Sequence, residues 1–374
     1  MFLKPFLQWN SLLLSALMIS GCTTATLPPH ESLTNAMNKT FEISGYNYDS
    51  STRITKMTIP KSDTNASETD STRNSIYLQK GIDVIRGFSL GIAGAVDYSH
   101  AIKTESTYDF HYNRDNVEVS VKLPFLFDYS TKTLYMGKTF LNTIFPMDES
   151  DEGKFIRFDL NDTLISSALG EESLSQFDEN KVRSINSAMK EGTLKAFTNL
   201  NPSLFTYVPL SPKEKFSGSV QKVHLTLDRN QSMTLILTIT DALVQKMYTE
   251  SMLTKEAYGS YMLFSDPKQL STLTENMNLQ LTFDFGITTE GQIALIQSQI
   301  NASDKEEEFT LGIENITRLN SFNDPQFTLS PEHSGSVDYK ETFQKWTELF
   351  PPEPAIDPLT DLTEISNLND EQTR

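Results

Sequence analysis

The chain has 374 residues, with 49 acidic and 31 basic side chains, and its formal net charge is −18. Recognition of nucleic-acid phosphates needs a basic surface, so this charge argues against a nucleic-acid-binding protein. The same charge would oppose unaided binding to an anionic lipid surface. A single cysteine excludes a disulfide framework and cysteine-based zinc sites.

The first element in chain order is a short apolar run, SLLLSALMIS, over residues 11–20, after a weakly basic start that contains Lys4. A helix needs about 20 apolar residues to cross a bilayer, so this run is too short for a membrane span. A basic start, a short apolar core and small residues at its end are typical of a secretory signal peptide. We therefore predict that residues 1–21 are a signal peptide.

The only cysteine follows this run, in the sequence Ile19-Ser20-Gly21-Cys22. An aliphatic residue, two small residues and a cysteine resemble the lipobox of bacterial lipoproteins. The resemblance implies that the Cys22 thiol, as the nucleophile, receives a diacylglyceryl group. It also implies cleavage between Gly21 and Cys22 and acylation of the new amino group by a fatty acid such as palmitate. Two or three acyl chains would make a durable membrane anchor.

The residue after the cysteine is Thr23. In the lipoproteins of enteric-type bacteria, an Asp at this position retains the protein in the inner membrane. The resemblance therefore implies a Gram-negative cell envelope and an anchor in the outer membrane. It leaves open whether the body faces the periplasm or the cell surface.

Polar segments flank the expected body. Residues 23–39 contain Pro28-Pro29 and predict a flexible tether that, with the lipidated Cys22, spans 22–39. The last segment, 351–374, is acidic and rich in proline, which predicts a disordered tail. The body would then cover 40–350, as one domain or as two β-rich halves, about 40–210 and 211–350.

Most of the body alternates apolar and polar residues with a period of two, which is typical of half-buried strands. In TYDFHYN, Tyr108, Phe110 and Tyr112 share one face, and the turn NRDN leads to VEVSV, so 106–123 predicts a hairpin. The same pattern predicts a hairpin over 223–239 with RNQS as its turn, a strand over 279–287 followed by the turn TTEGQ, and a strand over 309–313.

Three segments instead show helical spacing: 173–197, which begins with a capping box from Ser173 to Gln176, 241–262 and 266–277. These helices stand between groups of strands and do not alternate with them one for one. The sequence therefore predicts an α+β fold, with a large curved antiparallel sheet and a few packed helices.

One stretch resembles an enzyme motif. GFSLG, residues 87–91, matches the G-x-S-x-G nucleophile elbow of α/β-hydrolases. The resemblance implies Ser89 as nucleophile and His333 as base, with a strand before the turn and a helix after it. The neighbouring residues instead predict antiparallel hairpins, in which Phe88 and Leu90 would alternate with Ser89 on a bulged strand.

A second stretch, DESDEGKFIRFD, partly resembles an EF-hand calcium loop. Asp148, Ser150 and Glu152 take the first, third and fifth places, Gly153 the sixth and Asp159 the twelfth. The fifth place prefers a shorter side chain and the twelfth prefers Glu. An exposed acidic turn is the simpler interpretation, and we expect no metal and no cofactor.

The aromatic residues carry the main functional hypothesis. A curved sheet whose face holds aromatic rings could enclose a lipid or an acyl chain. In pattern the body resembles the periplasmic lipoprotein-localisation carriers, whose half-open barrels are lidded by helices. We expect a non-enzymatic envelope protein that binds an apolar ligand or a partner protein, with a serine hydrolase as the alternative. The expected lining residues are Tyr108, Phe110, Tyr112, Phe125 and Phe127.

Overall fold

The computed structural model describes residues 27–59, 80–114, 116–138, 155–163, 178–266, 269, 272, 275–306 and 308–349. Its strands are β1 (Gly45–Thr58), β2 (Phe88–Asp97), β3 (Lys103–Arg114), β4 (Val117–Asp128), β5 (Thr133–Gly137), β6 (Phe155–Asp159), β7 (Phe205–Tyr207), β8 (Ser219–Leu227), β9 (Met277–Thr288), β10 (Ile293–Asp304), β11 (Thr310–Asn320) and β12 (Ser336–Asp338).

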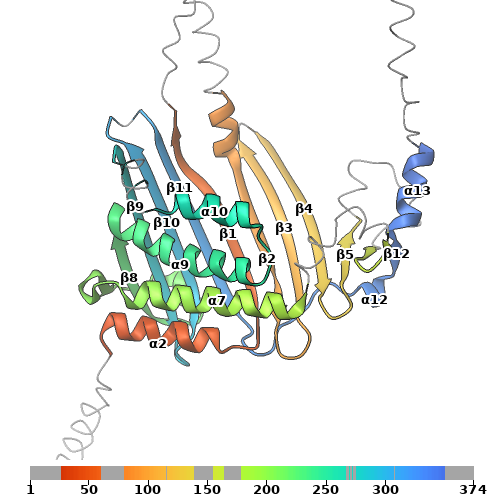
Figure 1. Ribbon diagram of the computed structural model, residues 1–374, viewed down its shortest axis with the longest axis horizontal. Coiled ribbons are helices and arrows are strands. Elements are labelled where there is room, and N and C mark those ends of the chain that lie inside the picture. Colours follow the sequence, from red (N-terminus) through yellow and green to blue (C-terminus); the bar gives the residue numbers. More distant parts are fainter. Residues whose placement is uncertain are drawn as a thin grey trace, which may run out of the picture.

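The helices of the described residues are α2 (Pro29–Phe41), α7 (Glu179–Thr198), α8 (Pro212–Lys215), α9 (Arg229–Thr249), α10 (Lys255–Phe264), α12 (Pro331–Ser334) and α13 (Tyr339–Leu349). A further helical segment covers 80–87, and Pro202–Leu204 form a single 3₁₀ turn. Helices α2, α7, α9 and α10 lie across one face of a single large sheet (Figure 1).

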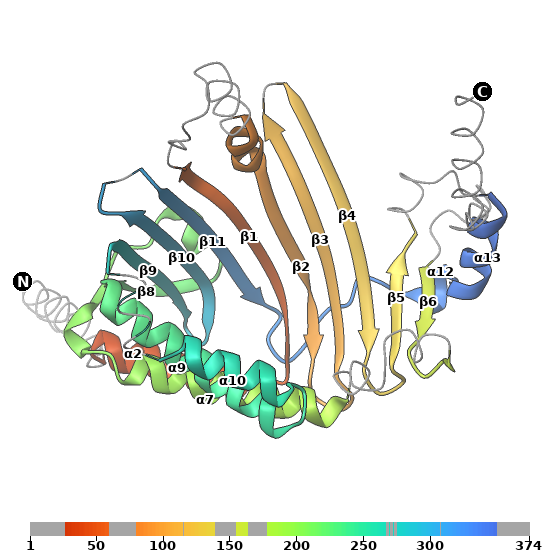
Figure 2. The ribbon, with the colours of Figure 1, turned by 45° about the horizontal axis from the view of Figure 1, so that its top comes forward.

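The sheet has twelve strands in the order β12-β6-β5-β4-β3-β2-β1-β11-β10-β9-β8-β7. Neighbouring strands pair antiparallel, except for β12 and β6, which are parallel. The sheet is open and curved (Figure 2). The predicted α+β class with a large antiparallel sheet is therefore confirmed.

The two faces of the sheet differ as the period of two requires. On the face under the helices, here called the helix face, Val223, Leu225 and Leu227 of β8 are fully buried. Their cross-strand partners on β9 include Leu281 and Phe285, which are also buried. These residues form the main core with side chains of α2, α7 and α9. The opposite face of the same strands carries polar side chains.

The prediction of a flexible tether over 22–39 is wrong from residue 29 onward. Pro29 to Phe41 form α2, and Leu33, Ala36 and Met37 on one side of this helix are buried in the main core. Proline is favourable in the first turn of a helix, so Pro29 marks a helix start. The polar composition reflects only the outward side of an amphipathic helix.

The prediction of a returning strand after RNQS is also wrong. Asp228 accepts a hydrogen bond from the Gln231 backbone N–H, and Gln231 Oε1 accepts one from the Asp228 N–H, which is a capping box. Helix α9 therefore begins at Arg229 and continues to Thr249. The helix predicted over 241–262 is in fact the end of α9 followed by α10.

The first predicted helix exists, but its start differs. Helix α7 begins at Glu179, and the Asp178 carboxylate caps it by accepting from the backbone N–H groups of Asn180 and Lys181. The capping box predicted from Ser173 to Gln176 lies outside the described residues, as does half of the helix predicted over 266–277. The disordered tail predicted for 351–374 is also outside them.

Helices α7 and α9 pack closely at Gly192. A methyl group at Gly192 would lie 2.8 Å from Cβ of Ala242, which is closer than carbon atoms pack. We expect Gly192→Ala to lower the free energy of unfolding by about 1 kcal/mol or more, because strain exceeds the gain in helix propensity. Gly259 in α10 has no atom within 4 Å of such a methyl. Gly259→Ala is the control and should raise the free energy of unfolding by about 0.5–1 kcal/mol. Chemical denaturation measures both changes.

The two glycine variants should therefore change stability in opposite directions. An equal increase in the free energy of unfolding of both variants would show that α7 and α9 are farther apart than they are in this structure.

On the opposite face, residues 321–330 cross behind β1 to β4 on their way to α12 (Figure 2). Glu105 of β3, only 3% exposed, fixes this segment. Its carboxylate accepts from the backbone N–H groups of Thr328 and Leu329 and from the Thr328 hydroxyl, at 2.8, 2.8 and 2.5 Å. Asn47 of β1 adds two hydrogen bonds with the backbone of Gln326. The segment thus links β11 to β12 at the edge of the sheet.

Candidate functional site

A cavity of about 590 Å³ lies between α2, α7 and the helix face of the sheet. This volume is within the range of about 300–1,000 Å³ that is usual for small-molecule sites. Its walls come from chain segments that are far apart in sequence, namely α2, β1, α7, β9, β10 and β11. Here the helices cover the helix face of the sheet, but their side chains do not fill the space between helices and sheet.

The floor of the cavity is apolar. Phe283 and Phe285 lie two residues apart on β9, so both side chains point to the helix face, and their rings stack with centroids 5.8 Å apart. Phe197 of α7 meets both rings edge-on, at 5.8 and 5.6 Å. The remaining apolar lining side chains come from α2, the residues that follow it, α7 and the strands: Met37, Phe41, Ile43, Tyr46, Met189, Ile293, Ile296 and Leu319.

The rim of the cavity is polar and cationic. Arg183, Asn186, Lys190 and Thr193 of α7 line it together, because residues three and four apart share one side of a helix. Arg183 pairs with Glu179, its Nη2 lying 2.6 Å from Glu179 Oε1. The same guanidinium donates to the carbonyl oxygens of the loop after β2, at Tyr98 and His100, and so fixes the start of α7 to the sheet.

Lys190 is the cation of this rim that has no carboxylate partner among the described residues within 4 Å. Its Nζ donates a hydrogen bond to the carbonyl oxygen of Phe41 at the end of α2. Burial lowers the pKa of the Lys190 amino group below its usual value. Burial likewise raises the pKa of the nearby Tyr98 hydroxyl to about 12, so this hydroxyl stays protonated at neutral pH. The arrangement offers hydrogen-bond donors and one unpaired positive charge beside an apolar floor.

The predicted lining residues of β3 and β4 lie on the helix face but not at this cavity. The register pairs Phe110 with Val121 and Tyr112 with Val119, as the predicted hairpin requires. Phe110 is 43% exposed and Val119 49% exposed, because α2, α7, α9 and α10 do not reach this end of the sheet (Figure 1). Nearer the helices, Tyr108 contacts Phe125 at 5.9 Å, and Phe127 is buried against Tyr129.

The local structure around Ser89 is not that of a nucleophile elbow. A helix over 80–87 precedes it and strand β2 continues through it, which is the reverse of the strand–turn–helix order that the elbow needs. In the β2–β3 register Ser89 faces His111. His333 lies in α12, beyond β3, β4, β5 and β6 in the sheet order, so the structure does not bring the proposed pair together (Figure 1).

The calcium-loop hypothesis falls mostly on residues that are not described. Asp148, Ser150 and Glu152 lie outside the described residues, and Asp159 ends strand β6, where it accepts from the Asn161 backbone N–H. Within the described part of the chain, no group of three or more His, Cys, Asp or Glu side chains is placed to hold a metal ion.

The opposite face carries polar clusters that sequence reasoning did not foresee. His224 of β8 lies 2.7 Å from Asp284 through Nδ1 and 3.2 Å from the Thr226 hydroxyl through Nε2. Lys222 beside them pairs with Glu214 at 2.8 Å. Asp284, His224 and the Thr226 hydroxyl are aligned in the order of a catalytic triad. They lie on an open polar sheet face away from the cavity, where a surface hydrogen-bond network is the simpler interpretation.

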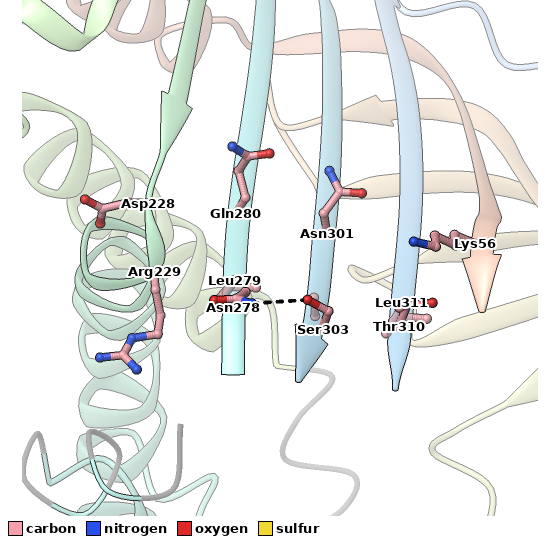
Figure 3. Close-up of a pocket in the computed structure, with 11 residues that line it drawn as sticks. Lys56, Asp228, Arg229, Asn278, Leu279, Gln280, Asn301, Ser303, Thr310 and Leu311 are labelled. Carbon is pink, nitrogen blue, oxygen red and sulfur yellow. Dashed lines mark hydrogen bonds between the residues drawn. The ribbon is translucent and has the colours of Figure 1, made fainter. Parts of the chain in front are cut away.

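A second hollow, of about 670 Å³, lies at the ends of β9, β10 and β11 (Figure 3). Its side chains are mainly polar and include Lys56, Arg229, Gln280 and Asn301, while Asn278 donates to Ser303 at 3.5 Å. Asn278 and Gln280 are exposed, so this hollow is open to solvent. It offers no enclosed apolar volume, and the cavity beneath α7 is the stronger candidate site.

Comparison with known proteins does not place the chain in a family. No family model matches the sequence, and no curated protein matches it significantly. Among solved structures, the crystal structure of LprF from Mycobacterium bovis covers 81% of this chain and 96% of its own, with a TM-score of 0.31 and 9% identity. Similarity at this level carries no weight for function, which must be inferred from this chain's own residues.

The described helices differ from membrane spans. None of them combines the length and the apolar character that crossing a bilayer requires.

The cavity residues could be found only in part from the sequence. The alternation that predicts a strand over 279–287 already places Phe283 and Phe285 on one face, and helical spacing places Asn186, Lys190 and Phe197 on one side of a predicted helix. Nothing in the local pattern shows that these two surfaces face each other.

Proposed function

We propose that this protein is an outer-membrane-anchored lipoprotein of the cell envelope that binds a ligand with an apolar chain in the cavity beneath α7. The lipobox-like sequence that ends at Cys22 supports the anchor. The single observation that carries ligand binding is the cavity itself, which is apolar on its floor and bounded by donors on its rim. The binding is non-enzymatic.

The chemistry of the lining narrows the ligand class. The stacked rings of Phe283 and Phe285 with Ile296 would contact methylene groups, whose burial is worth about 0.8 kcal/mol each. Lys190 at the rim has a depressed pKa because burial disfavours its charge, and a ligand anion would supply the missing partner. An acyl chain that ends in a carboxylate or phosphate fits both parts of the site.

A cavity-filling substitution tests this proposal. Ile296 of β10 lines the cavity, so Ile296→Trp should displace about two methylene groups of the ligand and weaken binding roughly tenfold. Ile300→Trp is the matched control, because Ile300 lies on the same strand and face but outside the cavity and is 36% exposed. The measurements are the lipid extracted from purified protein and the displacement of a fluorescent fatty acid.

The control variant should bind as the unmodified protein does. Equal binding by all three proteins, or no fatty-acid binding by the unmodified protein, would contradict ligand binding in this cavity.

A partner protein is the second candidate occupant of the helix face. Its support is the uncovered apolar strip formed by Phe88, Phe110, Val117 and Val119, each more than two-fifths exposed. If the cavity proves empty of lipid, a photo-crosslinking residue at position 110 should capture an envelope protein from living cells, and the same residue at the polar position 118 should not.

A further inference from the structure

The short helix α8 and its flanking residues form an exposed apolar tip. Phe216, the residue after α8, is 90% exposed, which is the largest exposure among the described large apolar residues. Val220, near the start of β8, is 58% exposed. A ring that is almost fully exposed gains nothing from the fold of the isolated chain and is available to contact a surface outside it.

The start of the described chain contacts β7, the edge strand of the sheet that precedes α8 in the chain. Tyr207 of β7 donates from its hydroxyl to the Leu27 carbonyl oxygen at 2.6 Å, and the Val208 N–H donates to the Lys222 carbonyl oxygen at 3.1 Å. Leu27 and Tyr207 are themselves exposed. The N-terminal end of α2 lies at the β8 edge of the sheet in both views (Figures 1 and 2), and α8 joins β7 to β8 at the same edge.

The distance to the anchor is short. Cys22 is five residues before Leu27, and a fully extended chain spans at most about 3.6 Å per residue. The Cys22 backbone is therefore no more than about 18 Å from Leu27. A lipidated Cys22 would hold this edge of the sheet against the bilayer surface, because α2 begins at Pro29 and leaves little free chain.

The local charge also suits a lipid surface, although the whole chain is strongly acidic. Lys213 and Lys215 flank the tip and are exposed. The acid between them, Glu214, is buried in its ion pair with Lys222. Basic residues beside exposed apolar ones are typical of segments that lie in the membrane interface, where each cation near anionic lipid adds about 1 kcal/mol.

We propose that the tip of Lys213, Lys215, Phe216 and Val220 inserts into the surface of the membrane that carries the lipid anchor. The proposal rests on the anchor at Cys22. Phe216 would enter the boundary between headgroups and acyl chains, and the two lysines would contact lipid phosphates. The tip and the anchor together would fix the orientation of the sheet on the membrane, which a lipid on a free tether cannot do.

The test uses the single cysteine. The chain from Cys22 onward, with Trp346→Phe to remove its remaining tryptophan, is coupled through Cys22 to a maleimide phospholipid in phosphatidylcholine–phosphatidylglycerol vesicles. Phe216→Trp places a reporter at the tip. Glu118→Trp places the control reporter on exposed β4, at the far ends of the strands (Figure 1). Brominated lipids then quench only tryptophans that enter the membrane.

We expect Trp emission at position 216 to shift to the blue and to be quenched, and emission at position 118 to be unaffected. Charge reversal by Lys213→Glu with Lys215→Glu should reduce the quenching. Emission at 216 that stays unquenched, or a blue shift that depends on protein concentration and not on brominated lipid, would overturn the proposal. Because maleimide coupling does not need cellular lipidation, this failure is distinct from failure of the anchor itself.

Discussion

Cys22→Ala is expected to abolish lipidation of the protein. In the proposed lipoprotein the thiol sulfur of Cys22 would accept the diacylglyceryl group, and alanine offers no nucleophile at that position. Cleavage before residue 22 by the lipoprotein peptidase should fail as well, so the precursor keeps its 21-residue signal peptide.

Metabolic labelling with a palmitate analogue, followed by separation of inner and outer membranes, measures this effect. The labelled band should disappear in Cys22→Ala. Thr23→Asp is the matched control, since it keeps the thiol: label should remain, and the protein should move toward the inner membrane. Undiminished labelling of Cys22→Ala would refute the lipobox interpretation.

Leu225→Ala is expected to cause the largest loss of stability, about 2–5 kcal/mol. Leu225 is fully buried at the centre of β8, in the core that α2, α7 and α9 close, and it does not line the cavity. Its removal leaves a hole that rigid strands on both sides cannot fill. Chemical denaturation of the lipid-free body gives the change in free energy of unfolding.

Phe110→Ala is the contrasting variant on the same face of the sheet. If Phe110 were part of an ordinary core, its removal would lower the free energy of unfolding by about 3–5 kcal/mol. Because Phe110 is 43% exposed, we expect a cost of about 1 kcal/mol or less and no change in lipid held beneath α7. A loss as large as that of Leu225→Ala would mean that Phe110 is covered in solution.

The comparison of Leu225 with Phe110 shows how far the sequence can predict the fold. Both residues lie in segments of clean alternation, and for both the pattern correctly gives a strand and the face of that strand. The pattern cannot give burial, because burial depends on whether a helix from elsewhere in the chain crosses that part of the sheet. Helices α2, α7 and α9 cover the β8–β11 side, and the far ends of β3 and β4 stay open.

The two wrong local predictions have related causes. The segment after Asp228 has apolar residues at every second position, Met233, Leu235, Leu237 and Ile239, but Ile236 interrupts the alternation. Its capping box and the packing of Ile239 and Ala242 near Gly192 favour a helix. Residues 29–39 read as polar because only one side of α2 is apolar. In both cases tertiary packing on one helical face outweighed the local pattern.

The sequence by itself determined what depends on neighbouring residues: the lipobox-like pattern that ends at Cys22, most strands with their faces, and the α+β class. The tertiary structure alone decided what depends on distant residues meeting. It joined the apolar side of β9 and β10 to the polar stripe of α7 to make a cavity, and it set Leu27 beside Tyr207 on the edge strand β7. Period and composition describe one segment at a time, whereas a binding site consists of the contacts between segments.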